Sequence, residues 1–106
     1  MTAPHPPLAP IPMSKKYLFS KAGIEWLKTN QRGVYAIYNS SGRCVYIGKG
    51  DIRQRLLDHL NGGSPLITLQ KPKYWSAQVS NSEKAMLILE KKLILALAPA
   101  ANQRVG

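Results

Sequence analysis

Alternating apolar and polar positions predict a β-hairpin in the first half of the chain. Residues 34–38 and 44–47 are rich in β-branched and aromatic side chains, and the Asn-Ser-Ser-Gly of residues 39–42 favours a turn. A loop centred in that turn pairs Tyr35 directly with Tyr46 on one face, although a one-residue bulge would change this register. We interpret the two tyrosines either as a small aromatic core or as part of a functional site.

Apolar residues at helical spacing predict a short helix before the hairpin and a longer one after it. Ser20 is the N-cap of the first, which we expect to cover the sheet. Asp51 caps the second, with Gln54 reaching back as in a capping box. The apolar face of this second helix consists of Ile52, Leu56, Leu57 and Leu60. Arg55 and His59 are four residues apart, so they share one side of the helix at the rim of that face.

The segment after the second helix is read as a loop followed by a third strand. Glycines and prolines within residues 61–72 predict a mobile loop, and Lys71 and Lys73 make it a candidate contact for a polyanion. Residues 74–79 alternate as a strand does, which places Trp75 on the inward face. We expect Trp75 to lie in the core rather than to stack on a base.

A last helix carries an acidic residue where an apolar one is expected. Ser80 and Glu83 form a capping box, and the helix should end near Leu97. Glu90 lies at the centre of an apolar stripe formed by Met86, Leu87, Leu93, Ile94 and Leu97. An inward carboxylate must be paired, as in a salt bridge to Arg55, or be protonated, or bind a cation. A site with one protein carboxylate and several waters suits magnesium.

Composition narrows the function classes. The 106 residues include 15 Lys and Arg against 5 Asp and Glu, a formal charge of +10 spread along the chain, which suits a polyanion such as nucleic acid. The sequence contains no long apolar span of the kind that would indicate a membrane protein. The lone Cys44 offers no disulfide framework, which favours a reducing compartment, the cytoplasm. Residues 1–13 are proline-rich and predict a disordered tail, so residues 14–106 form the single domain.

The ordered motifs resemble a known family. The chain contains Gly33-Val34-Tyr35, then Tyr46-Ile47-Gly48-Lys49, then Arg55 with His59 four residues later, then Leu89-Glu90 in a helix, and finally Pro99 and Asn102. This order resembles the GIY-YIG nucleases, and the spacing is most similar to the catalytic domain of the bacterial excision-repair nuclease subunit. The chain departs from the pattern in two places: Val34 replaces isoleucine, and His59 stands where repair members often have tyrosine.

The resemblance implies a fold and a set of roles. The fold is a small α/β (α+β) sandwich, with a central three-stranded sheet flanked by helices. Glu90 would hold one Mg²⁺ or Mn²⁺ ion, Arg55 would neutralise the phosphate, and Asn102 would support the hydrogen bonds of the site. Tyr35 is the expected general base, with Tyr46 orienting the water or the phosphate, and the choice among Tyr35, Tyr46 and His59 stays open. Lys49 and His59 are its helpers, and Gly33 and Gly48 allow close backbone approach or a plain turn. Expected nucleic-acid contacts are Lys49, Arg53, Arg55, Lys71 and Lys73.

The sequence therefore predicts a metal-dependent endonuclease that hydrolyses DNA. The alternative is a nucleic-acid-binding module that keeps the fold without the chemistry, although such a module would be expected to lose Tyr35, Arg55 or Glu90. A basic structural or ribosome-associated protein would leave Glu90 unexplained beyond a salt bridge. DNA against RNA, the strand structure of the substrate, and the use of a partner protein or a dimer for targeting stay open.

Overall fold

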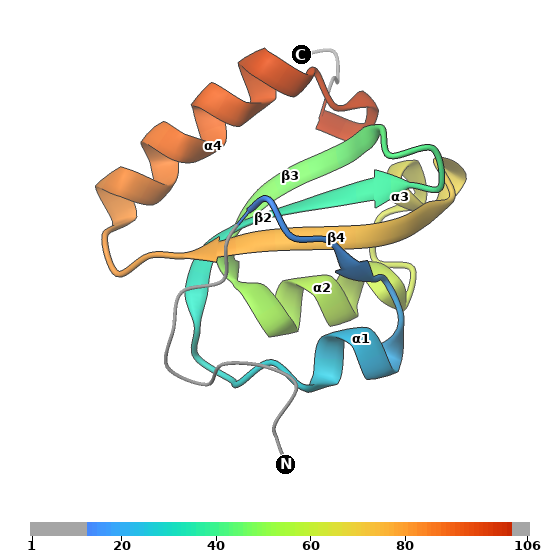
Figure 1. Ribbon diagram of the computed structural model, residues 1–106, viewed down its shortest axis with the longest axis horizontal. Coiled ribbons are helices and arrows are strands. Elements are labelled where there is room, and N and C mark those ends of the chain that lie inside the picture. The colour runs from blue at the N-terminus through green and yellow to red at the C-terminus, as the bar shows by residue number, and fades with distance from the viewer. Residues whose placement is uncertain (1–12, 103–106) are drawn as a thin grey trace.

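The computed structural model describes residues 13–102, which form a sheet with helices on both faces (Figure 1). The antiparallel sheet has four strands in the order β1-β4-β2-β3. The strands are β1 (Tyr17–Leu18), β2 (Arg32–Asn39), β3 (Cys44–Asp51) and β4 (Pro72–Val79). The helices are α1 (Lys21–Glu25), α2 (Ile52–Leu60), α3 (Pro65–Leu69), α4 (Glu83–Leu97) and the 3₁₀ turn η1 (Ala100–Asn102). The predicted sandwich is confirmed, and β1 adds a two-residue edge to the three expected strands.

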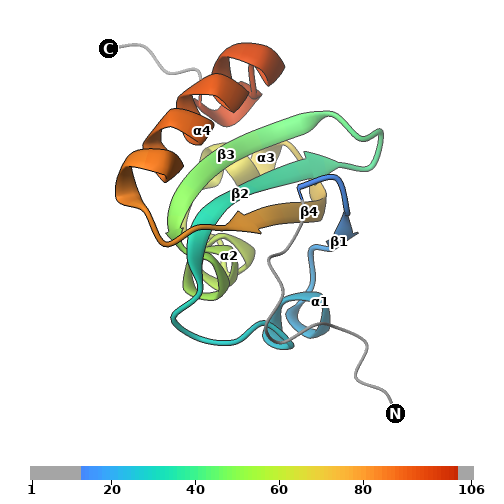
Figure 2. The same ribbon diagram turned by 60° about the vertical axis from the view of Figure 1, so that its left-hand side comes forward.

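Each face of the sheet buries its own apolar cluster. Residues Val34, Ala36 and Tyr38 of β2 pack with Met86 of α4, whereas the alternate residues of β2 pack with α1, α2 and α3 on the other face. Figure 2 shows α4 alone on one side of the sheet. Trp75 is fully buried, as predicted for a core residue. Strand β2 reads as a continuous apolar run because both of its faces are covered.

The hairpin register differs from the prediction. Tyr35 lies opposite Gly48, and Tyr46 lies opposite Ile37, with an irregularity between Ile37 and Tyr38. The turn holds three residues because the side chain of Asn39 accepts hydrogen bonds from Ser41 and Arg43, and Gly42 takes a φ of 88°. The net shift is two residues, so Tyr35 and Tyr46 still share a face, but as diagonal neighbours.

The helix caps follow the sequence with two changes. Ser20 caps α1 and Asp51 caps α2, as predicted, and each side chain accepts a hydrogen bond from the backbone N–H three residues later. The amide of Gln54 does not return to the cap but donates to Asp58 over 3.0 Å. The cap of α4 is Ser82 rather than the predicted Ser80. The helix ends at Leu97, as expected.

The predicted mobile loop at residues 61–72 is wrong, because it contains α3. Pro65 sits in the first turn of this helix, where its fixed φ and missing N–H are tolerated. Ile67 is fully buried and anchors the helix to the core. The proline therefore starts a helix here instead of interrupting one.

The inward face of α4 is rotated relative to the predicted stripe. Met86 is buried, and Leu89, Leu93 and Ile94 pack against the same cluster. Leu87 and Leu97, which the stripe included, are 41% and 43% exposed. Glu90 is half-buried, and helical spacing still places it on the packed face, between Met86 and Ile94.

The predicted tail and the end of the predicted domain lie largely outside the residues that the structure describes. Most of the proline-rich stretch, residues 1–12, is outside the described residues, as are residues 103–106. Among residues 13–102, no helix is both long enough and apolar enough to span a bilayer.

Candidate active site

Tyr35 lies at the centre of the site because two glycines let the chain close around it. Its side chain is 2% exposed and rests on Gly48 of β3. A Cβ at Gly48 would overlap the hydroxyl of Tyr35 and come within 2.9 Å of Cε2 of Tyr46. A Cβ at Gly33 would overlap the carbonyl oxygen of Gln78 on β4. Both glycines are therefore positions of close approach inside strands, not turn residues.

Strands β2 and β3 and helix α2 bring two tyrosines and a histidine together. The hydroxyl of Tyr35 is hydrogen-bonded to Nε2 of His59 over 2.8 Å. The ring of Tyr46 lies 6.1 Å from that of Tyr35 and 5.1 Å from that of His59, the latter edge-on at 60°. The candidates for the general base therefore lie in one cluster, and two of them, Tyr35 and His59, are hydrogen-bonded.

Burial keeps both members of the hydrogen-bonded pair neutral. It raises the pKa of Tyr35, and nearby Tyr46 and Glu90 act in the same direction, while Arg55 lowers it. Burial also lowers the pKa of His59, so its imidazole is uncharged at neutral pH. The other ring nitrogen of His59, Nδ1, is buried and has no hydrogen-bond partner within residues 13–102. His59 is thus an uncharged imidazole in contact with a phenol that resists ionisation alone.

Arg55 and Glu90 approach this pair from different elements. Arg55 is exposed on α2, one turn before His59, and Glu90 comes from α4. Their charges act on Tyr35 with opposite signs, since Arg55 lowers the pKa of Tyr35 and Glu90 raises it. They do not form the salt bridge that was one reading of Glu90: the ion pairs among residues 13–102 join Glu83 to Arg32 and to Lys49.

Glu90 fits a metal site in which the protein supplies few of the ligands. Residues 13–102 contain no group of three or more His, Cys, Asp or Glu side chains that could cage an ion. Glu90 is a half-buried carboxylate without an ion pair in that range. Mg²⁺ keeps several waters and takes one or two carboxylates from the protein, so a single glutamate suits it.

Asn102 fastens the end of the domain to the site. Its Oδ1 accepts from the backbone N–H of Ile47 over 2.7 Å, and its Nδ2 donates to the backbone carbonyl of Ile47 over 2.9 Å. The amide thus replaces a neighbouring strand along one residue of β3. This fixes η1 beside Tyr46 and leaves one N–H of the amide for other contacts.

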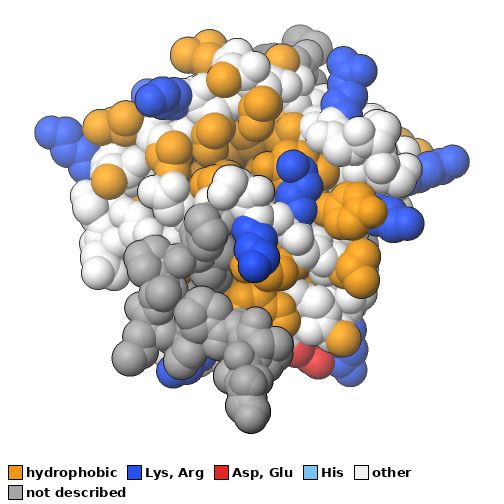
Figure 3. All heavy atoms as spheres, viewed as in Figure 1, with side chains coloured by type: hydrophobic (Ala, Val, Ile, Leu, Met, Phe, Trp, Pro, Cys, Tyr) orange, Lys and Arg blue, Asp and Glu red, His pale blue; other side chains and the backbone are white. Residues whose placement is uncertain are grey.

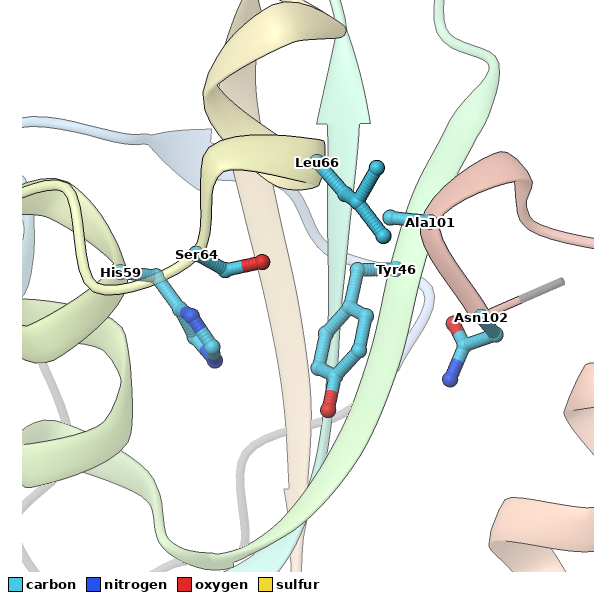
Figure 4. A pocket seen from close by; sticks show the side chains of 6 residues that line it. All are labelled: Tyr46, His59, Ser64, Leu66, Ala101 and Asn102. Atoms are coloured by element: carbon cyan, nitrogen blue, oxygen red, sulfur yellow. The ribbon is translucent and has the colours of Figure 1, made fainter. Parts of the chain in front are cut away.

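A cleft opens beside Tyr46 and His59, with a volume of about 340 Å³ (Figure 4). Its other lining residues are Ser64, Leu66, Ala101 and Asn102. Sequence reasoning missed Ser64 and Leu66, because residues 61–72 were read as a loop. The signal that could have found them is Ser64-Pro65, an N-cap residue followed by proline at the first helical position.

The remaining predicted residues lie away from this cluster. Lys49 pairs with Val34, so its side chain leaves the sheet on the α4 face, where Nζ lies 2.9 Å from Glu83. Arg53 is half-buried on α2. Lys71 and Lys73 are exposed near the start of β4, by the hairpin turn rather than by Tyr35. Figure 3 shows separate Lys and Arg side chains on the face that it draws, most of them near the rim, among apolar and neutral groups.

A family model described as "UvrC-like GIY-YIG domain" matches residues 31–103, which include every element from β2 to η1. The chain belongs to the UvrC-like GIY-YIG domain family. The family prediction made from the ordered combination of motifs is therefore confirmed.

Relatives of this GIY-YIG domain are much longer proteins. UvrABC system protein C of Dictyoglomus thermophilum is 37% identical over 73 residues, which cover 66% of this chain and 12% of that protein. The protein of the same name from Nitrosomonas europaea is 38% identical over 77 residues, covering 68% of this chain and 13% of its own length. The chain thus spans about an eighth of the relatives that it matches.

Solved structures agree with the fold and with the enzyme class. The GIY-YIG N-terminal endonuclease domain of UvrC from Thermotoga maritima, bound to its catalytic divalent cation magnesium, is 28% identical with a TM-score of 0.63. The match covers 79% of this chain and 100% of that domain. A point mutant of that domain, also bound to its catalytic cation, matches with the same TM-score, 0.63. The predicted fold class and the predicted class of enzyme, an endonuclease, are confirmed at the level of the domain.

Proposed function

We propose that this GIY-YIG domain hydrolyses DNA phosphodiester bonds with the help of one divalent cation. The observation that carries the proposal is the 2.8 Å hydrogen bond between the buried hydroxyl of Tyr35 and Nε2 of His59. Arg55 and Glu90 act electrostatically on the same hydroxyl. The pair of Tyr35 and His59 therefore supplies an acceptor for a proton, Arg55 a cation for the phosphate and Glu90 a carboxylate for a metal.

The pair of Tyr35 and His59 provides the base. A water that attacks phosphorus must lose a proton. Tyr35 alone is a poor acceptor for it, because burial raises the pKa of Tyr35 and so keeps its hydroxyl protonated. His59 is uncharged at neutral pH, so its Nε2 takes the proton of the Tyr35 hydroxyl as that hydroxyl takes one from the water. The tyrosine touches the reacting water, and the histidine holds the proton. Tyr46, with its ring beside both, orients the water or the phosphate.

Arg55 is placed to bind the phosphate. It is exposed on the same side of α2 as His59, and its planar guanidinium can donate two hydrogen bonds to non-bridging oxygens. These bonds strengthen as negative charge builds up during attack. The formal charge of +10 also draws a polyanion to the domain.

Glu90 is the residue that would hold the cation. When bound, Mg²⁺ or Mn²⁺ stabilises the negative charge on the leaving 3′ oxygen. The half-buried carboxylate without an ion pair in residues 13–102 fits that task, and it belongs to no group of three or more described His, Cys, Asp or Glu side chains. Lys49 on the α4 face contributes positive charge, as do Arg53, Lys71 and Lys73 on the surface.

The competing function is a binding module without chemistry. It is disfavoured because Tyr35, His59, Arg55 and Glu90 are all retained and the first two are hydrogen-bonded. A cytoplasmic location and a targeting partner or dimer stay predictions. The full activity of the longer relatives is not implied for a chain that spans about an eighth of their length.

The test is cleavage of labelled single-stranded, duplex and branched DNA and of RNA, with Mg²⁺, with Mn²⁺ and with a chelator. Glu90→Gln should abolish cutting and keep binding, whereas Glu25→Gln, an exposed carboxylate on α1, should leave both unchanged. Arg55→Ala should abolish cutting, whereas Arg43→Ala removes the same charge from the exposed hairpin turn and should not. Wild-type turnover by Glu90→Gln would contradict the metal assignment. Binding without cutting on every substrate would favour the binding module.

A further inference from the structure

The cleft beside the active site has walls of two different kinds. Figure 4 shows His59 and Ser64 on one side of Tyr46 and Asn102 on the other, with Leu66 of α3 above. The cleft holds about 340 Å³. That lies within the range of pockets that bind small organic groups. The site assigned above uses Tyr46, His59 and Asn102 for other purposes, but it leaves Ser64 and Leu66 without a role.

The apolar wall is exposed where a core residue would be covered. Leu66 is 49% exposed, although it belongs to the same short helix as the fully buried Ile67. The aromatic rings of Tyr46 and His59, whose centroids are 5.1 Å apart, line the same cleft, and Leu66 lies next to Tyr46 (Figure 4). A flat apolar group in the cleft could therefore contact both Leu66 and an aromatic ring.

The polar wall has donors that the fold does not use. Ser64 is the N-cap of α3, yet its side chain makes no capping hydrogen bond. A serine at this position normally caps its helix, so a free hydroxyl at the rim of a cleft is unusual. Asn102 spends one N–H and its oxygen on Ile47, which leaves its second N–H available. The cleft therefore combines apolar faces with hydrogen-bonding groups at the edge.

A nucleobase has this same combination of apolar faces and polar edges. We propose that the cleft receives an unpaired nucleobase next to the scissile phosphodiester, so that the enzyme cuts single-stranded or locally unpaired DNA. The inference rests on the proposed function, since Tyr46 and His59 belong to both the cleft and the site. A base stacked and paired within a duplex cannot enter such a cleft without leaving the stack. Stacking on aromatic side chains tolerates all four bases, so no sequence preference is expected.

The first test removes one base at a time. Single-turnover cleavage is measured on a labelled single strand and on strands with one abasic residue at successive positions around the cut. We expect one position at which the abasic residue lowers the rate by about 5- to 100-fold, the range expected for loss of one stacked base. Leu66→Ala should lower the rate on the intact strand about 5-fold or more and change little on that abasic strand. Leu69→Ala, on the same helix but 72% exposed and outside the cleft, should behave as wild type on both.

The second test does not depend on cutting. The Glu90→Gln variant is titrated with single strands that carry 2-aminopurine at the same positions, and the fluorescence of the base is followed. We expect a change at one position, reduced when Leu66→Ala is added. If wild type cuts intact and abasic strands equally, or cuts duplex as fast as single strands, the cleft does not take a base. The proposed nuclease function would still hold in that case. If nothing is cut, the proposed function fails, and the fluorescence decides the cleft: no change at any position overturns it.

Discussion

Replacing His59 by phenylalanine tests the proton path most directly. The substitution keeps a ring of similar size between Tyr46 and Tyr35 but removes both nitrogens. The hydroxyl of Tyr35 then loses the acceptor that lies 2.8 Å away. Since Nδ1 has no hydrogen-bond partner in residues 13–102, no second bond is broken there.

The expected loss of rate follows from the ionisation of Tyr35. An ordinary tyrosine has a pKa of ~10, so at pH 7 about one molecule in ~1,000 is a phenolate. Burial raises the pKa of Tyr35 further, so its phenolate fraction is smaller still. Without His59 the enzyme must rely on that fraction, and the rate of the chemical step should fall by at least ~100- to 1,000-fold, within the range for general-base catalysis. Binding of DNA should change little, because His59 is uncharged.

The assay is single-turnover cleavage from pH 5 to pH 9 at fixed, saturating Mg²⁺. The wild-type rate should rise with pH as His59 loses its proton. This rise should lie below pH ~6.5, because burial lowers the pKa of His59, and the rate should be level near pH 7. The His59→Phe rate should instead keep rising with pH through 9, since only hydroxide or phenolate remains. A His59→Phe enzyme within about threefold of wild type, with the same pH profile, would refute the proton path.

Four further outcomes are expected. Gly48→Ala forces a Cβ into the hydroxyl of Tyr35 and should cost ~1–3 kcal/mol of unfolding free energy, measured by urea denaturation, with loss of cleavage. Asn102→Ala should cost ~1–3 kcal/mol in the same assay, because the buried backbone groups of Ile47 lose both partners; an unchanged midpoint would contradict this. Because the folded pKa of His59 is lowered, the unfolded chain binds more protons at acid pH. The stability that His59 contributes is present above pH ~6.5 and is lost as pH falls below it, a dependence that His59→Phe should lack. Affinity for DNA should fall steeply with salt as phosphate contacts release counterions, and a flat profile would argue against a phosphate-binding surface.

Local patterns predicted the elements better than their exact pairing. The caps at Ser20 and Asp51 and the end of α4 are set by residues close in sequence, and these were found. The hairpin register was missed by two residues, because Gly42 allows a three-residue turn and a further irregularity follows it. Such bulges leave no clear mark in the pattern of apolar residues.

The sequence predicted which residues belong to the candidate site better than it predicted their contacts. The alternation of β3 alone places Lys49 on the face opposite Tyr46, which sequence reasoning did not use. The hydrogen bond between Tyr35 and His59 joins a strand to a helix 24 residues later, so it depends on how α2 lies on the sheet. The position of Glu90 depends likewise on the rotation of α4, which is decided by the packing of Met86 and Leu89.

The two hydrogen bonds between Asn102 and Ile47 also protect the domain from association with other copies of itself. Strand β3 is an edge of the sheet, and an open edge is a template on which strands of other molecules can add. The amide occupies the N–H and the carbonyl of Ile47, in the middle of that edge, while the opposite edge is only the two-residue β1. The residue that closes the active site therefore also helps a small sheet stay unassociated at high concentration.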